Sequence, residues 1–239
     1  MSAFHGAAAD VLFDAPQRSL PRSGFKRLEG TTWLNDEVIS AYTWLLNERD
    51  AKYCAADPSR RPCYAMHTFF ASTLHGSQSK TPERISRALS KYAVPLDVFS
   101  LDKWLVPINI GGMHWAAMVV HCQKMRVEYV DSMGGRGIEF MEGMLAFLKY
   151  EHRVRKGREL PPGWQMFSYQ HTTPQQANGC DCGVFACITM DFIMEGLPFD
   201  FRQDDPEKLP EGAVVHDDMP RFRQVIGTSI LAREAPASM

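Results

Sequence analysis

The segment CGVFACITMDFIMEG, residues 182–196, constrains the fold more than any other part of the chain. It is apolar nearly all round, so a helix formed by it has no polar face to turn toward water and must be covered by other elements. Its apolar run, which Asp191 ends, is roughly half of the ~20 residues needed to span a bilayer. The segment therefore predicts a buried helix, and the 239 residues suffice for one large domain around it.

Further helices and strands are predicted from the spacing of apolar residues. Apolar positions with a helical period follow Asn35, which is a good N-cap. Short apolar runs between Gly or charged residues predict adjacent strands. Helices are expected at 33–50, 81–92, 138–153 and 220–233, strands at 104–110, 115–120 and 127–130, and a short strand or turn before a short helix within 64–76. This content predicts an α+β fold, with helices flanking one central mixed or antiparallel sheet.

No break in composition divides the chain. Residues 1–30 show no helical or strand period, so we expect an irregular N-terminal arm with one packed segment around Val11 to Phe13. Residues 31–239 are expected to form a single domain. The stretch 204–217 is acidic and carries two prolines, which predicts a surface insertion.

Charge and cysteine content exclude several classes of protein. Lys and Arg number 26 and Asp and Glu 28, so the net charge of −2 does not favour a nucleic-acid partner. The basic run at 152–158 is interpreted as a solvated helix end, with a nuclear-localisation or nucleic-acid patch as the alternative. The N-terminus has no secretory signal, and the six cysteines are too clustered for a disulfide scaffold. We therefore expect free thiols in an intracellular protein of the nucleus or cytoplasm.

Four residues suggest nucleophilic catalysis. Cys182 opens the buried helix, where free N–H groups favour a thiolate. His114, between a Gly-Gly turn and a strand, is the candidate base, and Asp131 ends the third strand. If the strands around them pair as a hairpin, His114 and Asp131 face each other at one end. Gln176 precedes Cys182 closely enough to donate to an oxyanion, and Gly183 is expected to let a substrate backbone approach.

Five short motifs include or flank these candidates. They are WLNDEVI (33–39), PxNxxxxHW (Pro107 to Trp115), VDSMGG (130–135), PQQANGCDCG (174–183) and DMPRFR (218–223). Together these motifs resemble the SUMO-specific cysteine proteases of the Ulp/SENP family. The order of histidine, aspartate, glutamine and cysteine agrees, and so do their spacings, and the resemblance covers roughly residues 30 to 232.

The resemblance implies a papain-like fold and a role for each candidate. Cys182 is implied as the nucleophile, with His114 as general base and then acid. Asp131 is implied to orient His114, and Gln176 to stabilise the oxyanion with the Cys182 backbone N–H. No cofactor or metal is implied, and the cleaved bond follows the Gly-Gly terminus of SUMO.

The resemblance also implies how a substrate is recognised. Trp33 and Trp115 are similar to the aromatic walls of the tunnel that this family uses for a Gly-Gly tail. Met133 is similar to a methionine lining that tunnel, and Asp36 to an aspartate that pairs with an arginine of the modifier. The implied partners are SUMO and SUMO-conjugated proteins, with a monomeric enzyme and no nucleic-acid or membrane partner.

Each assignment has an alternative. The chain is alternatively a protease for another ubiquitin-like modifier, as in the deneddylating branch, or a non-catalytic SUMO-binding module. Trp33 and Trp115 are alternatively packing residues, and Asp36 a partner of the helix dipole. A zinc site at Cys180, Cys182, Cys187 and His171 lacks the usual paired spacing. Cys180 places a second thiol near Cys182, and we hypothesise that it protects the site against oxidation.

Overall fold

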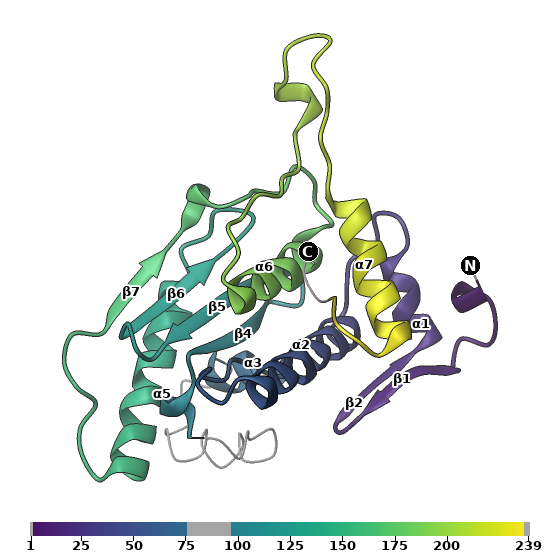
Figure 1. The fold of residues 1–239 in the computed structure, drawn as a ribbon. Coiled ribbons are helices and arrows are strands. Elements are labelled where there is room, and N and C mark those ends of the chain that lie inside the picture. The colour runs from purple at the N-terminus through teal and green to yellow at the C-terminus, as the bar shows by residue number, and fades with distance from the viewer. Residues whose placement is uncertain (1, 76–96, 237–239) are drawn as a thin grey trace.

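A mixed sheet of five strands lies at the centre of the fold (Figure 1). The structure, a computed structural model, describes residues 2–75 and 97–236, so the helix expected at 81–92 lies outside the described residues. The three middle strands are antiparallel, and each edge strand runs parallel to its neighbour. The strand order is β3 (Tyr64–Ala65), β4 (Lys103–Ile110), β5 (His114–His121), β6 (Arg126–Val130) and β7 (Gln165–Ser168).

Helices cover both faces of the sheet because apolar side chains alternate along its strands. Leu105 and Val119 point into a hydrophobic cluster shared with α2 (Asp36–Ala56), α6 (Cys182–Glu195) and α7 (Met219–Ala232). Their neighbours Val106 and Val120 point into a second cluster on the other face, formed with α3 (Phe69–His75) and α5 (Ile138–Lys156). The α+β architecture with a mixed central sheet is therefore confirmed.

Helix α6 is buried, as its sequence predicts. Every residue from Cys182 to Phe192 is buried, and the one acidic residue among them is neutralised. Asp191 accepts a hydrogen bond from the Tyr42 hydroxyl at 2.6 Å and from the Arg49 guanidinium at 2.5 Å. Both partners come from α2, so this carboxylate ties the two helices together.

The first long helix begins where expected but ends later. Asn35 Oδ1 accepts a hydrogen bond from the Val38 N–H at 3.1 Å, which confirms the N-cap. The helix continues to Ala56, past the end expected at residue 50. Arg49 consequently lies within the helix, where its buried guanidinium pairs with Asp191 rather than with the helix terminus.

The N-terminal region is not the irregular arm that was expected. It forms a hairpin of β1 (Val11–Ala15) and β2 (Arg18–Pro21), followed by the short helix α1 (Arg22–Phe25). The packed segment expected here is present, because Phe13 is buried against Trp44 of α2 at 5.4 Å between ring centroids. The expectation was wrong because the turn places Gln17 at a positive φ of 62°. Such turns are usually recognised in a sequence by a glycine at that position, and this turn has none.

Strand β7 lies within 155–181, where only loop was expected. It pairs with β6 over four residues and remains half-exposed, so its residues show no clear period. Only the hydrogen bonds to a distant strand define it. In the described residues, none of the helices combines the length and the apolar character that crossing a bilayer requires.

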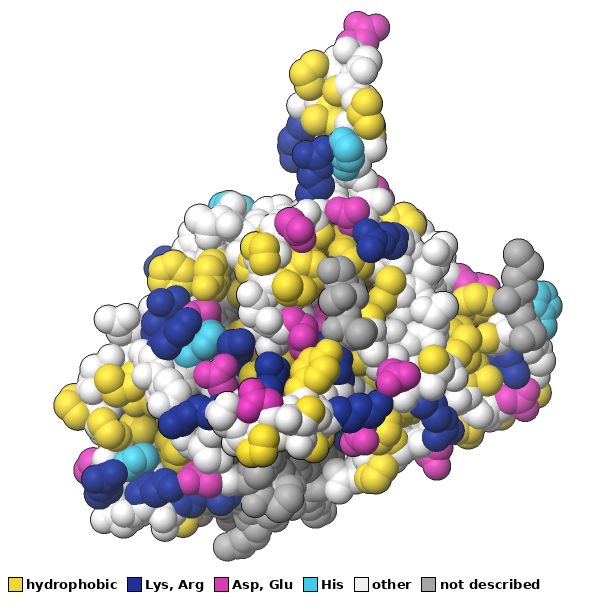
Figure 2. Space-filling view, viewed as in Figure 1, with side chains coloured by type: hydrophobic (Ala, Val, Ile, Leu, Met, Phe, Trp, Pro, Cys, Tyr) yellow, Lys and Arg dark blue, Asp and Glu magenta, His cyan; other side chains and the backbone are white. Residues whose placement is uncertain are grey.

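Residues 204–217 form a finger that projects from the body of the protein (Figures 1 and 2). At its base the Asp204 N–H donates to the His216 carbonyl at 2.8 Å, and the His216 N–H donates to Asp204 Oδ2 at 3.0 Å. Farther out, Val214 is 74% exposed. This segment therefore adds little buried apolar surface to the fold.

A shortened finger is expected to leave the stability of the domain unchanged. Replacing residues 205–215 with Gly-Gly would join Asp204 and His216 by a two-residue hairpin turn and keep the hydrogen bonds at the base. The melting temperature should change by less than about 3 °C, since surface changes away from buried contacts cost little. Differential scanning calorimetry measures this, and a much larger drop would show that the finger packs on the body.

Candidate active site

The start of α6 meets one end of the β5–β6 hairpin. Ala117 of β5 pairs with Val130 of β6, which confirms the predicted pairing. His114 is the first residue of β5, and Asp131 directly follows β6, so their side chains meet at 2.7 Å between Nε2 and Oδ1. The His114 imidazole also makes a hydrogen bond with the Cys182 thiol. The structure thus brings together three residues that are distant in the chain.

The carboxylate of Asp131 is held in place on several sides. Besides His114, it accepts hydrogen bonds from the Met133 N–H at 2.8 Å and the Tyr129 hydroxyl at 3.2 Å. Burial alone raises the pKa of this carboxyl, but the bonds from His114 and Met133 outweigh burial and lower the pKa below its ordinary value. Gly135 leaves the room required, because a Cβ there would lie 2.3 Å from Asp131 Oδ2.

The histidine and the cysteine favour their charged forms. Burial lowers the pKa of His114, but its hydrogen bonds to Asp131 and Cys182 raise it to about 9. Burial raises the pKa of the Cys182 thiol, yet hydrogen bonds from His114 and from the N–H groups of Trp115 and Gly183 bring it below its ordinary value. Both shifts therefore favour the thiolate–imidazolium form of the pair over the neutral form.

Gln176 is held in place by its neighbours. Its Oε1 accepts from the Ser132 hydroxyl at 2.7 Å, and its backbone N–H donates to the Ser132 carbonyl at 2.9 Å. One amide N–H donates to the Asn178 carbonyl at 2.5 Å. A side-chain amide carries two such donors, and this contact uses one of them. The sequence analysis missed the role of Ser132, although it follows Asp131 directly.

Cys182 lines a cavity of about 240 Å³. Trp33 stands at its edge and is 46% exposed, whereas Trp115 is buried. The Trp115 indole N–H donates to the Leu34 carbonyl at 3.1 Å, which fixes the orientation of the ring. The cavity is lined by Arg27, Trp33, Leu34, Asn35, Asp36, Asn109, Gly112, Met113, Trp115 and Cys182.

The other predicted binding residues differ in their placement. Asp36 lies in the first turn of α2 and also borders the cavity, so both interpretations of it are compatible with the structure. Met133 is 61% exposed and is not among the residues lining the cavity. Gly183 is approached by the protein itself, because a Cβ there would lie 2.8 Å from the Leu34 Cβ and 3.4 Å from Trp115 Cδ1. Internal packing thus explains this glycine.

Six of the lining residues were not predicted as site residues, namely Arg27, Leu34, Asn35, Asn109, Gly112 and Met113. Arg27 precedes the first recognised motif, and Met113 occupies the turn before His114. Asn109 Oδ1 accepts from the Gly112 N–H at 2.8 Å and so supports that turn, in which Gly112 adopts a φ of 75°. Asn109 lies inside the PxNxxxxHW pattern, so the motif contained the signal.

The remaining thiols lie in different surroundings. Burial and the nearby Asp181 raise the pKa of Cys180, which favours the protonated form of this thiol. Its protective role remains a hypothesis. Cys187 is fully buried within α6, while His171 is exposed and contacts Gln175. In residues 2–75 and 97–236, no cluster of three or more potential ligand residues suits a metal ion.

A family of known proteases is similar to this chain in sequence. Residues 32–233 match the Ulp1 protease family, C-terminal catalytic domain. Sentrin-specific protease 2 of Rattus norvegicus is 31% identical over 201 residues, which cover 83% of this chain and 32% of that protein. The chain therefore spans about a third of the length of that relative.

Two solved structures have a similar fold. The catalytic domain of the Chaetomium thermophilum Ulp1-like SUMO protease is 26% identical, with a TM-score of 0.75, and the match covers 98% of this chain and 87% of that one. The C-terminal Ulp1 protease domain in complex with Smt3, the yeast ortholog of SUMO, is 22% identical, with a TM-score of 0.74 and coverages of 97% and 91%. The predicted papain-like α+β fold is thereby confirmed.

The pairing of charges predicts unusual thiol reactivity. At pH 6, iodoacetamide should alkylate Cys182 at least about tenfold faster than an ordinary thiol. Asp131→Asn removes the anion that stabilises the His114 imidazolium, so the rate at pH 6 should fall about tenfold and the profile should move to higher pH. Glu159→Gln, an exposed carboxylate remote from the site, is the matched control. Identical profiles for wild type and Asp131→Asn would contradict the assignment.

Proposed function

This chain belongs to the Ulp1 protease family, and we propose that it is a cysteine protease that cleaves after the C-terminal Gly-Gly of SUMO. The substrates are SUMO-conjugated proteins, SUMO precursors, or both. The observation that carries this proposal is the contact of Cys182 with His114 at the end of a cavity walled by Trp33 and Trp115. We place its action inside the cell, in the nucleus or cytoplasm, where thiols such as the six free cysteines persist.

The proposed reaction is acyl transfer through a thioester. The Cys182 thiolate attacks the carbonyl carbon of the terminal glycine, and the electron pair of that C=O bond moves to the oxygen. His114 donates its proton to the departing amine as the C–N bond breaks, with Asp131 keeping the ring oriented. A water molecule, deprotonated by His114, then hydrolyses the thioester and releases the carboxylate and the Cys182 thiolate.

The oxyanion of the tetrahedral intermediate needs preorganised donors. The Cys182 backbone N–H at the start of α6 and the free N–H of Gln176 are the proposed pair. Ser132 fixes the Gln176 amide before substrate arrives, so little reorganisation is needed during the reaction. Removing one such donor typically costs about 100- to 1,000-fold in kcat.

Specificity is proposed to come from the size of the cavity. A Gly-Gly tail has no side chains, so it passes between the Trp33 and Trp115 indoles where a bulkier tail is excluded. Asp36 and Arg27 border the same cavity with opposite charges, which suits polar contacts to the body of a modifier. A protease for another ubiquitin-like modifier shares this chemistry, so probes with different modifiers are needed to separate the two functions.

The nucleophile is tested by Cys182→Ser. Turnover of a SUMO fusion should fall by at least about ten-thousandfold, while SUMO binding stays within about twofold, because the tail contacts do not involve the sulfur. Wild type and Cys180→Ser should both react with SUMO vinyl sulfone, and Cys182→Ser should not. Preferential reaction with a different ubiquitin-like vinyl sulfone would overturn the SUMO assignment, and retained cleavage by Cys182→Ser would overturn the choice of nucleophile.

The tunnel is tested by truncating its walls. Trp33 is half-exposed, so Trp33→Ala should lower kcat/KM for SUMO cleavage about tenfold or more with little change in melting temperature. Trp115→Ala should lower both kcat/KM and the melting temperature, because that ring is also buried. Trp44→Ala, which truncates an indole packed on Phe13 away from the site, is the control for stability alone. Normal kinetics with a lower melting temperature in Trp115→Ala would make that residue purely structural.

A further inference from the structure

The aspartate before Cys182 stands at the N-cap position of α6, but its side chain does not cap the helix. Asp181 is the N-cap residue of α6, yet its side chain makes no hydrogen bond to the first turn. An N-cap carboxylate ordinarily accepts from the second or third N–H of its helix, which here are those of Gly183 and Val184. The backbone does its usual part, since the Asp181 carbonyl accepts from the Phe185 N–H at 2.9 Å. Only the carboxylate is turned away.

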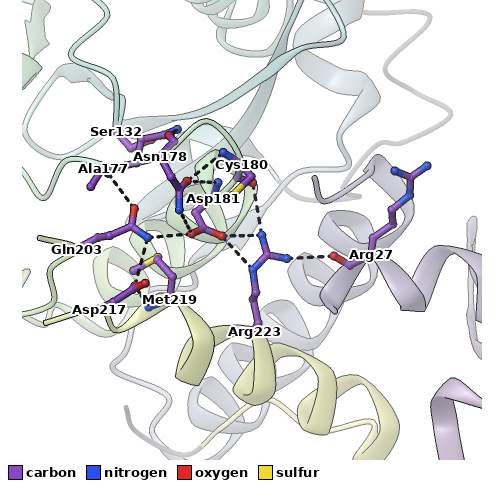
Figure 3. A network of polar contacts seen from close by, with 11 residues as sticks. Arg27, Ser132, Ala177, Asn178, Cys180, Asp181, Gln203, Asp217, Met219 and Arg223 are labelled. Carbon is purple, nitrogen blue, oxygen red and sulfur yellow. Dashed lines mark hydrogen bonds and ion pairs between the residues drawn. The ribbon is translucent and has the colours of Figure 1, made fainter. Parts of the chain in front are cut away.

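Arg223 of α7 holds this carboxylate. Its Nε and Nη2 both donate to Asp181 Oδ1, at 2.9 and 2.6 Å, and both side chains are about 5% exposed (Figure 3). The same guanidinium donates to the Cys180 carbonyl at 3.4 Å and to the Arg27 carbonyl at 3.1 Å. Arg27 borders the cavity, and its own guanidinium points away from Arg223 in Figure 3. One side chain thus joins α7, the residue before Cys182 and the cavity wall.

The second oxygen of the carboxylate is also satisfied. Asp181 Oδ2 accepts from Asn178 Nδ2 at 2.7 Å and from Gln203 Nε2 at 2.9 Å. Gln203 stands at the base of the finger, donates to Asp217 at 3.2 Å, and accepts the Ala177 N–H at 2.8 Å. The network therefore also fixes the backbone directly after Gln176.

The direction of the carboxylate matters because of what lies beside it. The Gly183 N–H donates a hydrogen bond to the Cys182 sulfur. A capping carboxylate would compete for that N–H or for the N–H of Val184. It would also bring a negative charge close to the thiolate and to the oxyanion that forms during catalysis. Like charges in a buried site disfavour each other strongly, and Arg223 both neutralises the carboxylate and removes it from the donors.

We propose that Arg223 is a positioning residue for catalysis, which holds the Asp181 carboxylate away from the first turn of α6 so that the N–H donors there serve the Cys182 thiolate and the oxyanion. This inference rests on the proposed function, because it concerns the same nucleophile. The charged and titratable groups facing this region are His114, Asp131, Cys180, Asp217, and the cavity residues Arg27 and Asp36.

The test compares single and double substitutions. Arg223→Met keeps an unbranched apolar side chain but leaves the Asp181 carboxylate uncompensated. Arg223→Lys keeps the charge but not the two-pronged contact. Asp181→Asn combined with Arg223→Met removes both charges, while Asn178 and Gln203 remain as partners. Arg221→Met, an exposed arginine on the same helix, is the matched control.

The main readout is the pH dependence of Cys182 alkylation by iodoacetamide, measured on folded protein with the mass of the modified peptide. Arg223→Met should move the acid limb upward by about one pH unit and lower kcat for SUMO cleavage about tenfold or more. Arg223→Lys should move the acid limb upward by a smaller amount than Arg223→Met does. The double variant should return the limb to within about 0.3 units of wild type, because no uncompensated carboxylate remains. Arg221→Met should match wild type.

A purely structural role gives a different pattern. Both Arg223→Met and the double variant would then lose stability while their alkylation profiles stayed at the wild-type position, and that result would falsify the proposal. If Arg223→Met does not fold, the alkylation profiles of the other two variants decide. The acid limb of Arg223→Lys must then lie at a higher pH than that of wild type, and the acid limb of the double variant must not. Alkylation needs no SUMO, so a chain that cleaves no SUMO refutes the proposed function while leaving this test intact.

Discussion

The position of α6 depends on two buried ion pairs, one near each of its ends. Asp181 pairs with Arg223 of α7 at 2.6 Å, and Asp191 pairs with Arg49 of α2 at 2.5 Å. Removing one partner of such a pair typically costs about 3–5 kcal/mol, because the other charge stays buried without compensation. An apolar helix has few directional contacts of its own, so these pairs determine how it is rotated and how far it is shifted along the sheet. Since Cys182 is its first residue, they also determine where the proposed nucleophile lies.

The active site and the hydrophobic core are parts of one packing arrangement. Leu34, Trp115 and Cys182 all belong to the cluster that α2, α6 and α7 form on one face of the sheet. The Trp115 ring contributes to this core, walls the cavity, and is fixed through its indole N–H to the Leu34 carbonyl. Because this part of the cavity lining is also core, the proposed tail-binding geometry is rigid before substrate arrives, and we expect this to lower the entropic cost of binding. We therefore expect stability and activity to be coupled at the buried Trp115 and to be separable at the exposed Trp33.

The finger shows how this fold accommodates additional chain length. Both ends of the segment are fixed at its base, where Gln203 and Asp217 form a β-bridge and Asp204 and His216 exchange hydrogen bonds. Each doubling of a flexible loop costs only about 0.6 kcal/mol in closure entropy, so the residues between those ends add little penalty. Because Gln203 also holds Asp181, the base of the finger belongs to the support of the active site even though the rest of it stands in solvent.

Local patterns in the sequence determined the long helices, the three middle strands and the candidates Cys182, His114 and Asp131. A helix or a hairpin satisfies its backbone among near neighbours, so period, cap and turn residues are sufficient to predict it. The N-terminal hairpin and β7 were missed because their turn or their pairing partner lies outside such patterns. Only the tertiary structure decided that Ser132 holds Gln176, that Gly183 is required by internal packing, and that Arg223 turns the Asp181 carboxylate aside. Those contacts join residues from different elements, and their geometry exists only once the elements have packed around α6.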